Sequence, residues 1–185
     1  MFRIISGRWK AKRISAPKNF DVRPTTDFAK EALFSILENR FDLDQVAVLD
    51  LFAGIGSISL EFASRYCEDI TAVENNVKHC NFIINTAAEL DMSLQINVNK
   101  ADAFDWLKKN RGKKQYDIIF ADPPFNLEKS KYDELIALIL SNNFLKEDGL
   151  LVLEHQAKNI PHHPDLQDTR KYGNLSFSLF SANNN

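Results

Sequence analysis

Residues 46–57 read VAVLDLFAGIGS, an apolar run that passes through an acid into a glycine-containing loop. An apolar run of this length predicts a buried strand, and a helical pattern begins directly after the loop. In an open parallel sheet, ligands bind beyond the carboxyl ends of the strands, where glycines allow the backbone to approach the ligand closely. Gly54 and Gly56 therefore predict a site for a nucleotide-like cofactor.

Outward from this stretch, strand and helix patterns alternate along the chain. Further apolar runs occupy residues 70–74, 94–98, 116–122 and 149–155. Helical patterns lie near residues 57–66, 77–91, 103–110 and 130–141. This alternation predicts a doubly wound α/β fold, in which helices cover both faces of a mostly parallel sheet. Closer to the carboxyl terminus, Gly173-Asn174 between two strand-like segments predicts an antiparallel hairpin at the edge of the sheet.

The first residues of the chain are strongly basic. Residues 1–18 hold six of the 23 basic residues and no acidic residue, so the rest of the chain has 17 basic residues against 25 acidic ones. Such an arm, with Trp9 inside it, is what a protein presents to a phosphate backbone, although an ordinary solvated basic strand is an equal alternative. The turn-like residues 22–27 follow and supply an N-cap for a helix whose apolar face begins at Ala29.

Acidic residues stand at the ends of the predicted strands. Glu74 ends the second run roughly 20 residues after the glycine loop, a spacing suited to hydrogen bonds with ribose hydroxyls. Asp102 follows the third run, where it accepts either from an adenine amino group or, equally, from the first N–H groups of a helix. A pyrophosphate would be repelled by Asp50, and Ser59 stands where the dinucleotide fingerprint requires a third glycine. S-adenosylmethionine (SAM), a cation without phosphate, suits the site better.

The run at residues 116–122 leads into DPPF, Asp122 to Phe125. Two prolines after an acid hold the backbone extended and remove N–H donors, so the Asp122 carboxylate and the Pro123 carbonyl oxygen both accept hydrogen bonds. An exocyclic NH₂ group offers the matching donors, and Phe125 is placed to stack on the ring that bears it. The motif predicts methylation of an amine on a planar group, against the alternative of a loop-forming proline pair beside a buried Phe.

These motifs resemble those of class I SAM-dependent methyltransferases, and specifically of the RsmD family of 16S rRNA guanine-N2 methyltransferases. The family's motifs stand here as RIISGRW at residues 3–9, RPTTD at 23–27, DLFAGIGS at 50–57, DPPF at 122–125 and YG at 172–173. The resemblance runs nearly end to end, and RPTTD together with DPPF is its most specific part. It implies a Rossmann-like fold with a seven-stranded, mostly parallel sheet, an antiparallel C-terminal hairpin, and a short N-terminal β-hairpin and helix.

The resemblance also implies a role for each part of the chain. Residues 1–24 form a basic hairpin arm that contacts RNA, and residues 25–185 form the SAM-dependent methyltransferase domain. The implied catalytic residues are Asp122, Pro123, Pro124 and Phe125. The implied cofactor-binding residues are Asp50, Phe52, Ala53, Gly54, Gly56, Ser57, Glu74, Asn75, Asp102 and Ala103. The implied RNA-binding residues are Arg3, Arg8, Trp9, Lys10, Lys12, Arg13, Arg23, Thr25 and Lys30.

One departure concerns the helix after RPTTD, which carries two arginines in the family and Phe28 and Lys30 here. A lysine holds a phosphate as a point charge but cannot make the two parallel hydrogen bonds that an arginine makes.

The implied reaction is methyl transfer from SAM to guanine N2 in 16S rRNA or in an assembling small ribosomal subunit. We expect a cytoplasmic monomer without a metal or membrane segment, because no apolar run approaches the roughly 20 residues that span a bilayer and Cys67 and Cys80 have no metal-ligand spacing.

Three other functions use part of the same sequence features. An adenine-N6 DNA or protein-amide methyltransferase shares the amine chemistry, but such enzymes more often carry an Asn before the two prolines. An NAD-dependent dehydrogenase is disfavoured by Ser59 and by the proline motif. A non-catalytic RNA-binding module would use the basic arm, yet it would need neither Asp122 nor the glycine loop.

Overall fold

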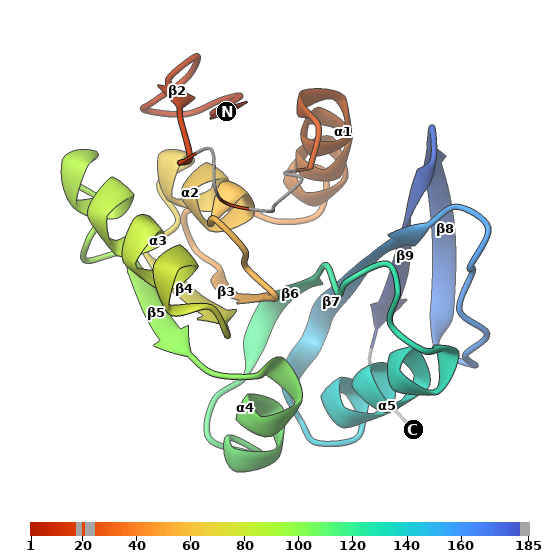
Figure 1. Cartoon of the computed structure of the whole chain (residues 1–185). Helices are drawn as coiled ribbons and strands as arrows, with labels where there is room; N and C mark the ends of the chain where they lie inside the picture. Colours follow the sequence, from red (N-terminus) through yellow and green to blue (C-terminus); the bar gives the residue numbers. More distant parts are fainter. Residues whose placement is uncertain (18–19, 21–24, 182–185) are drawn as a thin grey trace.

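A seven-stranded sheet forms the centre of the computed structural model, which describes residues 1–17, 20 and 25–181 (Figure 1). Its strands lie in the order β5-β4-β3-β6-β7-β9-β8. Their bounds are β3 Ala47–Leu51, β4 Asp69–Glu74, β5 Ile96–Lys100, β6 Tyr116–Ala121, β7 Leu145–Gln156, β8 Leu166–Tyr172 and β9 Leu175–Ser181. The strands β3 to β7 are parallel, whereas β9 pairs antiparallel with both β7 and β8. The predicted Rossmann-like sheet with its antiparallel hairpin is confirmed.

Helices cover both faces of this sheet (Figure 1). They are α1 Asp27–Glu38, α2 Ser57–Ser64, α3 Val77–Glu89, α4 Ala103–Lys109 and α5 Lys129–Leu140. One core joins Val48 and Phe120 of the sheet to α1, α2 and α3, and a second core joins Leu49 and Ile119 to α4 and α5. Alternate residues of a strand point to opposite faces, so the unbroken apolar runs are explained by burial on both sides.

The helix α1 begins where the sequence predicts it. Thr26 is its N-cap, and the Thr26 side chain accepts a hydrogen bond of 3.2 Å from the Ala29 N–H. Asp27 in the first turn complements the positive end of the helix dipole. One face, which includes Leu33 and Leu37, is fully buried against the sheet. This face packs α1 into the core that also contains α2 and α3.

A short antiparallel hairpin of β1 (Phe2–Arg3) and β2 (Arg13–Ile14) precedes α1, as predicted. Its buried side chains Phe2, Ile4 and Ile14 belong to the same core as α1 and α2. Gly7 has a positive φ of 81°, and a Cβ there would lie 1.9 Å from the carbonyl oxygen of Ser64 at the end of α2. The hairpin therefore packs directly on α2 and shares its core. The predicted boundary at residue 24 lies outside the described residues.

Both cysteines, Cys67 and Cys80, are buried and free. A buried, unpaired cysteine packs as a small apolar side chain. None of the helices in the described ranges combines the length and the apolar character needed to cross a membrane.

Candidate active site

The carboxyl ends of β3, β4, β6 and β7 open into one cavity of about 690 Å³. All four predicted catalytic residues line this cavity, and so does every predicted cofactor-binding residue except Gly56. The strand ends meet here because the four strands are parallel and lie consecutively in the sheet, in the order β4-β3-β6-β7. The structure thus brings the two predicted groups together from segments that lie about 70 residues apart in the chain, from Asp50 to Asp122.

The glycine loop between β3 and α2 has an uncommon backbone. Phe52, Gly54 and Gly56 have positive φ angles of 61°, 55° and 76°. A bulky side chain such as Phe52 rarely adopts this conformation, and such strain is typical of ligand-binding loops. A Cβ at Gly56 would approach Cγ1 of Ile83 on α3 to 2.8 Å, so glycine is required there for space as well as for φ. Gly56 thus shapes the loop from behind, which explains why it does not line the cavity.

Glu74 at the end of β4 holds two loops in place. Its Oε2 accepts a hydrogen bond of 2.8 Å from the Gly54 N–H, and its Oε1 accepts one of 2.7 Å from the Asn76 N–H. His79 Nδ1 lies 3.5 Å from the same Oε1 and also lines the cavity. Each carboxylate oxygen has a second lone pair, so Glu74 can still accept from ribose hydroxyls. His79 was not predicted from the sequence, because a single His on a helix carries no pattern.

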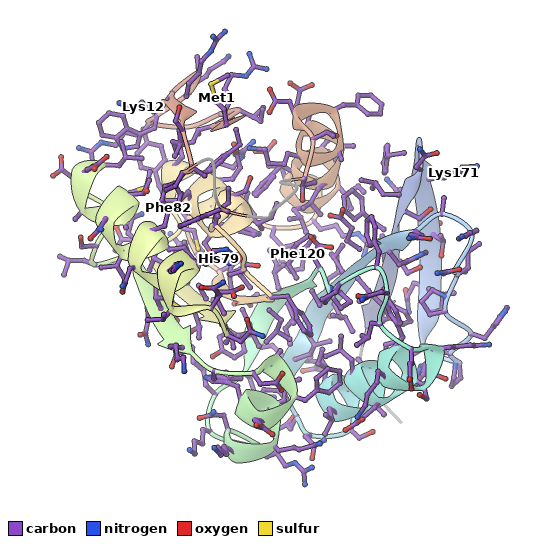
Figure 2. The ribbon with its side chains drawn as sticks, in the orientation of Figure 1. Met1, Lys12, His79, Phe82, Phe120 and Lys171 are labelled. Atoms are coloured by element: carbon purple, nitrogen blue, oxygen red, sulfur yellow. The ribbon has the colours of Figure 1, made fainter. Side chains whose placement is uncertain are left out.

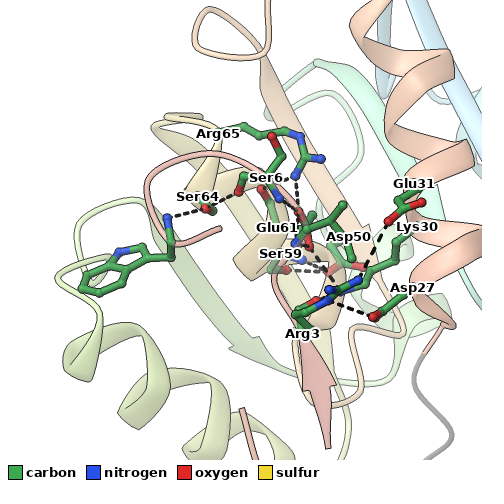
Figure 3. Close-up of polar contacts among 12 residues, drawn as sticks. Arg3, Ser6, Asp27, Lys30, Glu31, Asp50, Ser59, Glu61, Ser64 and Arg65 are labelled. Atoms are coloured by element: carbon green, nitrogen blue, oxygen red, sulfur yellow. Dashed lines mark hydrogen bonds and ion pairs between the residues drawn. The ribbon is translucent and has the colours of Figure 1, made fainter. Parts of the chain in front are cut away.

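Asp50 is almost completely buried and is held by Ser59 of α2 (Figure 3). Its Oδ2 accepts from the Ser59 backbone N–H at 3.1 Å and from the Ser59 hydroxyl at 2.5 Å. Burial raises the pKa of Asp50 to about 7, although both hydrogen bonds from Ser59 oppose the rise. In the sequence, Ser59 served only to disfavour a dinucleotide site, because it stands where a third glycine is required. In the structure, Ser59 donates both hydrogen bonds that hold Asp50.

Two further groups decide whether SAM fits the site. The Ser57 hydroxyl, in the first turn of α2, is buried and has no hydrogen-bond partner among the described residues, and Ser57 lines the cavity. Asp102 caps α4 through Oδ1, which accepts from the Phe104 and Asp105 N–H groups, while the residue stays exposed to the cavity. An unpaired hydroxyl beside a glycine loop, with acids around it, suits a cationic amino-acid and nucleoside ligand. The N-cap interpretation of Asp102 is confirmed, and its contact with adenine stays a prediction.

The turn after β6 carries the DPPF residues. The Asp122 N–H still donates to the Leu51 carbonyl oxygen, at 3.3 Å, so the sheet pairing continues one residue past β6. Pro123 is buried, and Phe125 is 40% exposed at the cavity. Burial raises the pKa of Asp122 well above its usual value, and the nearby carboxylates Glu154 and Asp50 raise it further. A rigid acceptor with an exposed ring beside it is what binding of a planar amine requires.

The cavity has a second wall that the sequence did not predict. Phe28 of α1 and Tyr172 of β8 line it, with ring centroids 6.0 Å apart in an edge-on arrangement. Glu154, two residues before the end of β7, also lines it and accepts a hydrogen bond of 3.2 Å from the Thr25 hydroxyl. The signal for Glu154 resembles that for Asp50, an acid inside a strand and close to the carboxyl end of an apolar run.

The cations of the N-terminal arm are exposed. Arg3, Arg8, Lys10, Lys12 and Arg13 all lie at the surface, and Figure 2 places Lys12 at the outer edge of the hairpin. Arg3 pairs with Asp27 at 3.0 Å, and Arg8 lies 3.7 Å from Asp91. These pairs are solvated and contribute little to stability, so the cations are available to phosphates.

Trp9 is more deeply placed than its neighbours in the arm. Its ring is partly buried against the core, and the Arg8 guanidinium lies 5.5 Å from the ring centroid. The Trp9 backbone N–H donates to the Ser64 hydroxyl at 3.0 Å. Trp9 thus anchors the arm to α2, and its stacking on a base stays a prediction.

Lys30 does not lie where an RNA contact requires it, so that prediction is wrong. Its side chain is fully buried, and Nζ lies 3.2 Å from Glu61 Oε2 of α2 and also donates to the Arg3 carbonyl oxygen (Figure 3). Glu61 further accepts from the Ile5 and Ser6 N–H groups and pairs with Arg65. Lys30 is therefore part of a buried network that holds the hairpin to α1 and α2.

The two residues from RPTTD that were predicted to bind RNA have different positions. Thr25 is buried at the cavity wall, so it is placed to meet a substrate group only inside the cavity. Arg23 lies outside the described residues.

Within residues 1–17, 20 and 25–181, no group of three or more His, Cys, Asp or Glu side chains is arranged to hold a metal ion.

Comparisons with known proteins identify the family and the fold of the chain. The family described as "Conserved hypothetical protein 95" matches residues 2–181. The chain is 33% identical to the ribosomal RNA small subunit methyltransferase D of Buchnera aphidicola, over 98% of this chain and 92% of the relative. The solved structure of a putative methyltransferase from Escherichia coli is 28% identical, with a TM-score of 0.81, and the alignment covers 97% of this chain and 96% of that one.

A Salinibacter ruber RNA methyltransferase, solved in complex with S-adenosyl-L-homocysteine, shares the fold at 13% identity with a TM-score of 0.68. That alignment covers 88% of this chain and 95% of the other. The family match spans almost the whole chain, and the fold is that of SAM-dependent methyltransferases. The chain therefore belongs to the RsmD family, the one described as "Conserved hypothetical protein 95".

Proposed function

We propose that this protein is a SAM-dependent methyltransferase that modifies the exocyclic N2 amine of a guanine in 16S rRNA, free or within an assembling small ribosomal subunit. The observation that carries the proposal is the single cavity that joins the glycine loop to Asp122 and Phe125. The names of full-length relatives, which are ribosomal RNA small subunit methyltransferases, support an rRNA substrate.

One end of the cavity suits the cofactor. The glycine loop and the unpaired Ser57 hydroxyl would hold its amino-acid part, Glu74 its ribose hydroxyls and Asp102 its adenine amino group. SAM supplies an electrophilic methyl group on a positively charged sulfur. Asp50, buried behind the loop and locked by Ser59, keeps the loop in its strained shape and contributes negative potential.

The other end suits a flipped base. The Asp122 carboxyl and the Pro123 carbonyl oxygen would accept the two hydrogens of the amine, which frees the nitrogen lone pair from conjugation with the ring. Phe125 would stack on the base and hold its plane, with Phe28 and Tyr172 as a second aromatic wall. Holding the nitrogen at about 3–3.5 Å from the methyl carbon supplies much of the catalysis. As the N–C bond forms and the methyl–sulfur bond breaks, the sulfur would leave as the neutral thioether of S-adenosylhomocysteine, and Asp122 would take the proton that the methylated nitrogen releases.

The arm would bind the RNA backbone. Arg3, Arg8, Lys10, Lys12 and Arg13 project from the hairpin that packs on α2. Each phosphate that they neutralise releases a counterion, so affinity falls with salt. We further propose that the protein acts as a monomer in the cytoplasm, and light scattering of the purified chain tests the oligomeric state.

The decisive experiment supplies labelled SAM with either naked 16S rRNA or small-subunit particles and identifies the labelled nucleoside by mass spectrometry. We expect N2-methylguanosine, and Asp122→Ala should abolish labelling while SAM still binds in calorimetry. The exposed variant Asp105→Ala is the matched control and should retain activity. Label in N6-methyladenosine would support the second candidate, an adenine-N6 methyltransferase with the same DPPF chemistry. Full activity of Asp122→Ala would refute the mechanism.

A further inference from the structure

Glu154 stands beside Asp122 on the same face of the sheet. The strands β6 and β7 pair with Ala121 opposite Leu153, so the next residues, Asp122 and Glu154, are neighbours. Phe120 and Val152, two residues earlier on each strand, both belong to the core under α1, α2 and α3. Because side chains alternate along a strand, Asp122 and Glu154 point toward the same side, where both line the cavity.

Glu154 is buried without the partners that a buried acid needs. It is 3% exposed, and among the described residues its one hydrogen bond comes from the Thr25 hydroxyl to Oε2. Among the described residues, no Lys, Arg or His forms an ion pair with Glu154, and no cation lowers its pKa. A buried carboxyl is costly unless it is paired or hydrogen-bonded, so the lone contact at Oε2 leaves Oε1 for a donor from outside the protein.

Glu61 is a buried acid with a purely structural role, and its contacts differ from those of Glu154. Its carboxylate is fully buried, and it is paired with Lys30 and Arg65 and accepts two backbone N–H groups. Glu154 has one neutral donor and opens onto the cavity instead. The difference indicates that the partner of Glu154 is a ligand that enters the cavity.

The edge of guanine that carries N2 offers a second donor next to it, the N1–H. Two neighbouring carboxyls match these two adjacent donors, and adenine and cytosine have a bare acceptor nitrogen at the corresponding place. We propose that Glu154 accepts the N1–H of the target guanine while Asp122 accepts from N2, which makes Glu154 a specificity-determining residue. This inference rests on the proposed function.

The protonation of the pair is compatible with that role. Burial raises the pKa of Glu154 to about 7, and the Thr25 hydrogen bond opposes the rise. Burial and the neighbouring carboxylates raise the pKa of Asp122 as well. One proton shared by the two groups relieves their repulsion and still leaves an accepting oxygen on each.

The test compares guanine with 2-aminopurine at the position of 16S rRNA labelled in the experiment above. 2-Aminopurine keeps the amine that is methylated but lacks both the N1–H and the O6 carbonyl of guanine. The change in the ratio of kcat/KM values between the wild-type enzyme and a Glu154 variant therefore reports the contact of Glu154 with N1. We expect the wild-type enzyme to favour guanine, and Glu154→Ala to lower the ratio about tenfold or more. Glu154→Gln should lower it too, because an amide can donate to the bare N1. Glu128→Gln, at an exposed N-cap without a side-chain hydrogen bond, is the control and should leave the ratio unchanged.

The outcomes separate the two proposals. Calorimetry with SAM confirms that each variant is folded before kinetics are measured. If Glu154→Ala and Glu154→Gln lower both kcat/KM values equally, Glu154 is only structural and the inference is wrong, while the proposed function stands. If the wild-type enzyme does not label guanine N2 at all, the proposed function fails and the inference fails with it.

Discussion

Replacing Lys30 with methionine should destabilise the fold and leave the RNA affinity of the folded protein unchanged. Methionine fills similar volume but removes the ammonium group that lies 3.2 Å from Glu61 Oε2. Breaking a buried ion pair costs about 3–5 kcal/mol, because the remaining charge loses its partner. Arg65 and the backbone N–H groups of Ile5 and Ser6 still hold Glu61, so we expect the lower end, about 3 kcal/mol. For a domain of this size, that lowers Tm by roughly 6–12 °C.

The assay has two parts, and Lys12→Met is the matched control because Lys12 is exposed on the arm. Urea unfolding should give the free-energy loss for Lys30→Met and almost none for Lys12→Met. RNA binding as a function of salt, measured where both variants are folded, should show a shallower slope for Lys12→Met alone. The reverse result, a stable Lys30→Met variant with weakened RNA binding, would refute the structural role of Lys30.

Three further predictions concern the cavity and the arm. Gly56→Ala should weaken SAM binding at least tenfold, as measured by calorimetry, because the new Cβ would lie 2.8 Å from Ile83. Gly112→Ala is the control and should leave the affinity unchanged, because Gly112 has a similar φ of 66° and a Cβ there would meet no atom within 4 Å. Burial raises the pKa of Asp50 and of Glu154 to about 7. Because these two carboxyls bind protons more tightly in the folded protein than in the unfolded chain, the free energy of unfolding should decrease as the pH rises from about 4 to 7. The cation SAM favours the ionised form of Asp50 at the cofactor end of the cavity, so its affinity should increase up to about tenfold between pH 6 and 8. A profile no steeper than that of S-adenosylhomocysteine, which lacks the sulfonium charge, would contradict this. Neutralising the five arm cations Arg3, Arg8, Lys10, Lys12 and Arg13 should reduce the salt slope of RNA binding by up to about 4 while SAM affinity is retained; an unchanged slope would count against the arm as the RNA contact.

The fold and the cofactor end of the cavity could be predicted because their signals are local. The central parallel strands contain apolar runs, and the site acids Asp50 and Glu74 stand at or next to the carboxyl ends of these runs. The alternation of strands and helices then brings these ends together without further information. Asp122 was predictable for the same reason, with two prolines to mark it.

The errors and omissions concern partners that are distant in sequence. Lys30 looks like any exposed helix lysine until Glu61, 31 residues later, is placed beside it. Glu154 is an acid within a strand run, and its importance depends on its register with Asp122 and on the Thr25 hydroxyl 129 residues earlier. Such through-space pairs leave no periodic pattern in a single sequence. Predicting them requires the register of the sheet and the packing of the hairpin on α2.

The way the hairpin is attached limits how the protein could be re-engineered. Gly7 touches the backbone of α2, and the hairpin side chains Phe2, Ile4 and Ile14 complete a core that α1 and α2 also use. Deleting residues 1–14 would expose that core and strip Glu61 of its backbone donors. A new RNA target therefore cannot be introduced by grafting a foreign arm onto the catalytic domain; only the outward-facing cations can be exchanged, one side chain at a time, on a hairpin that the fold needs intact.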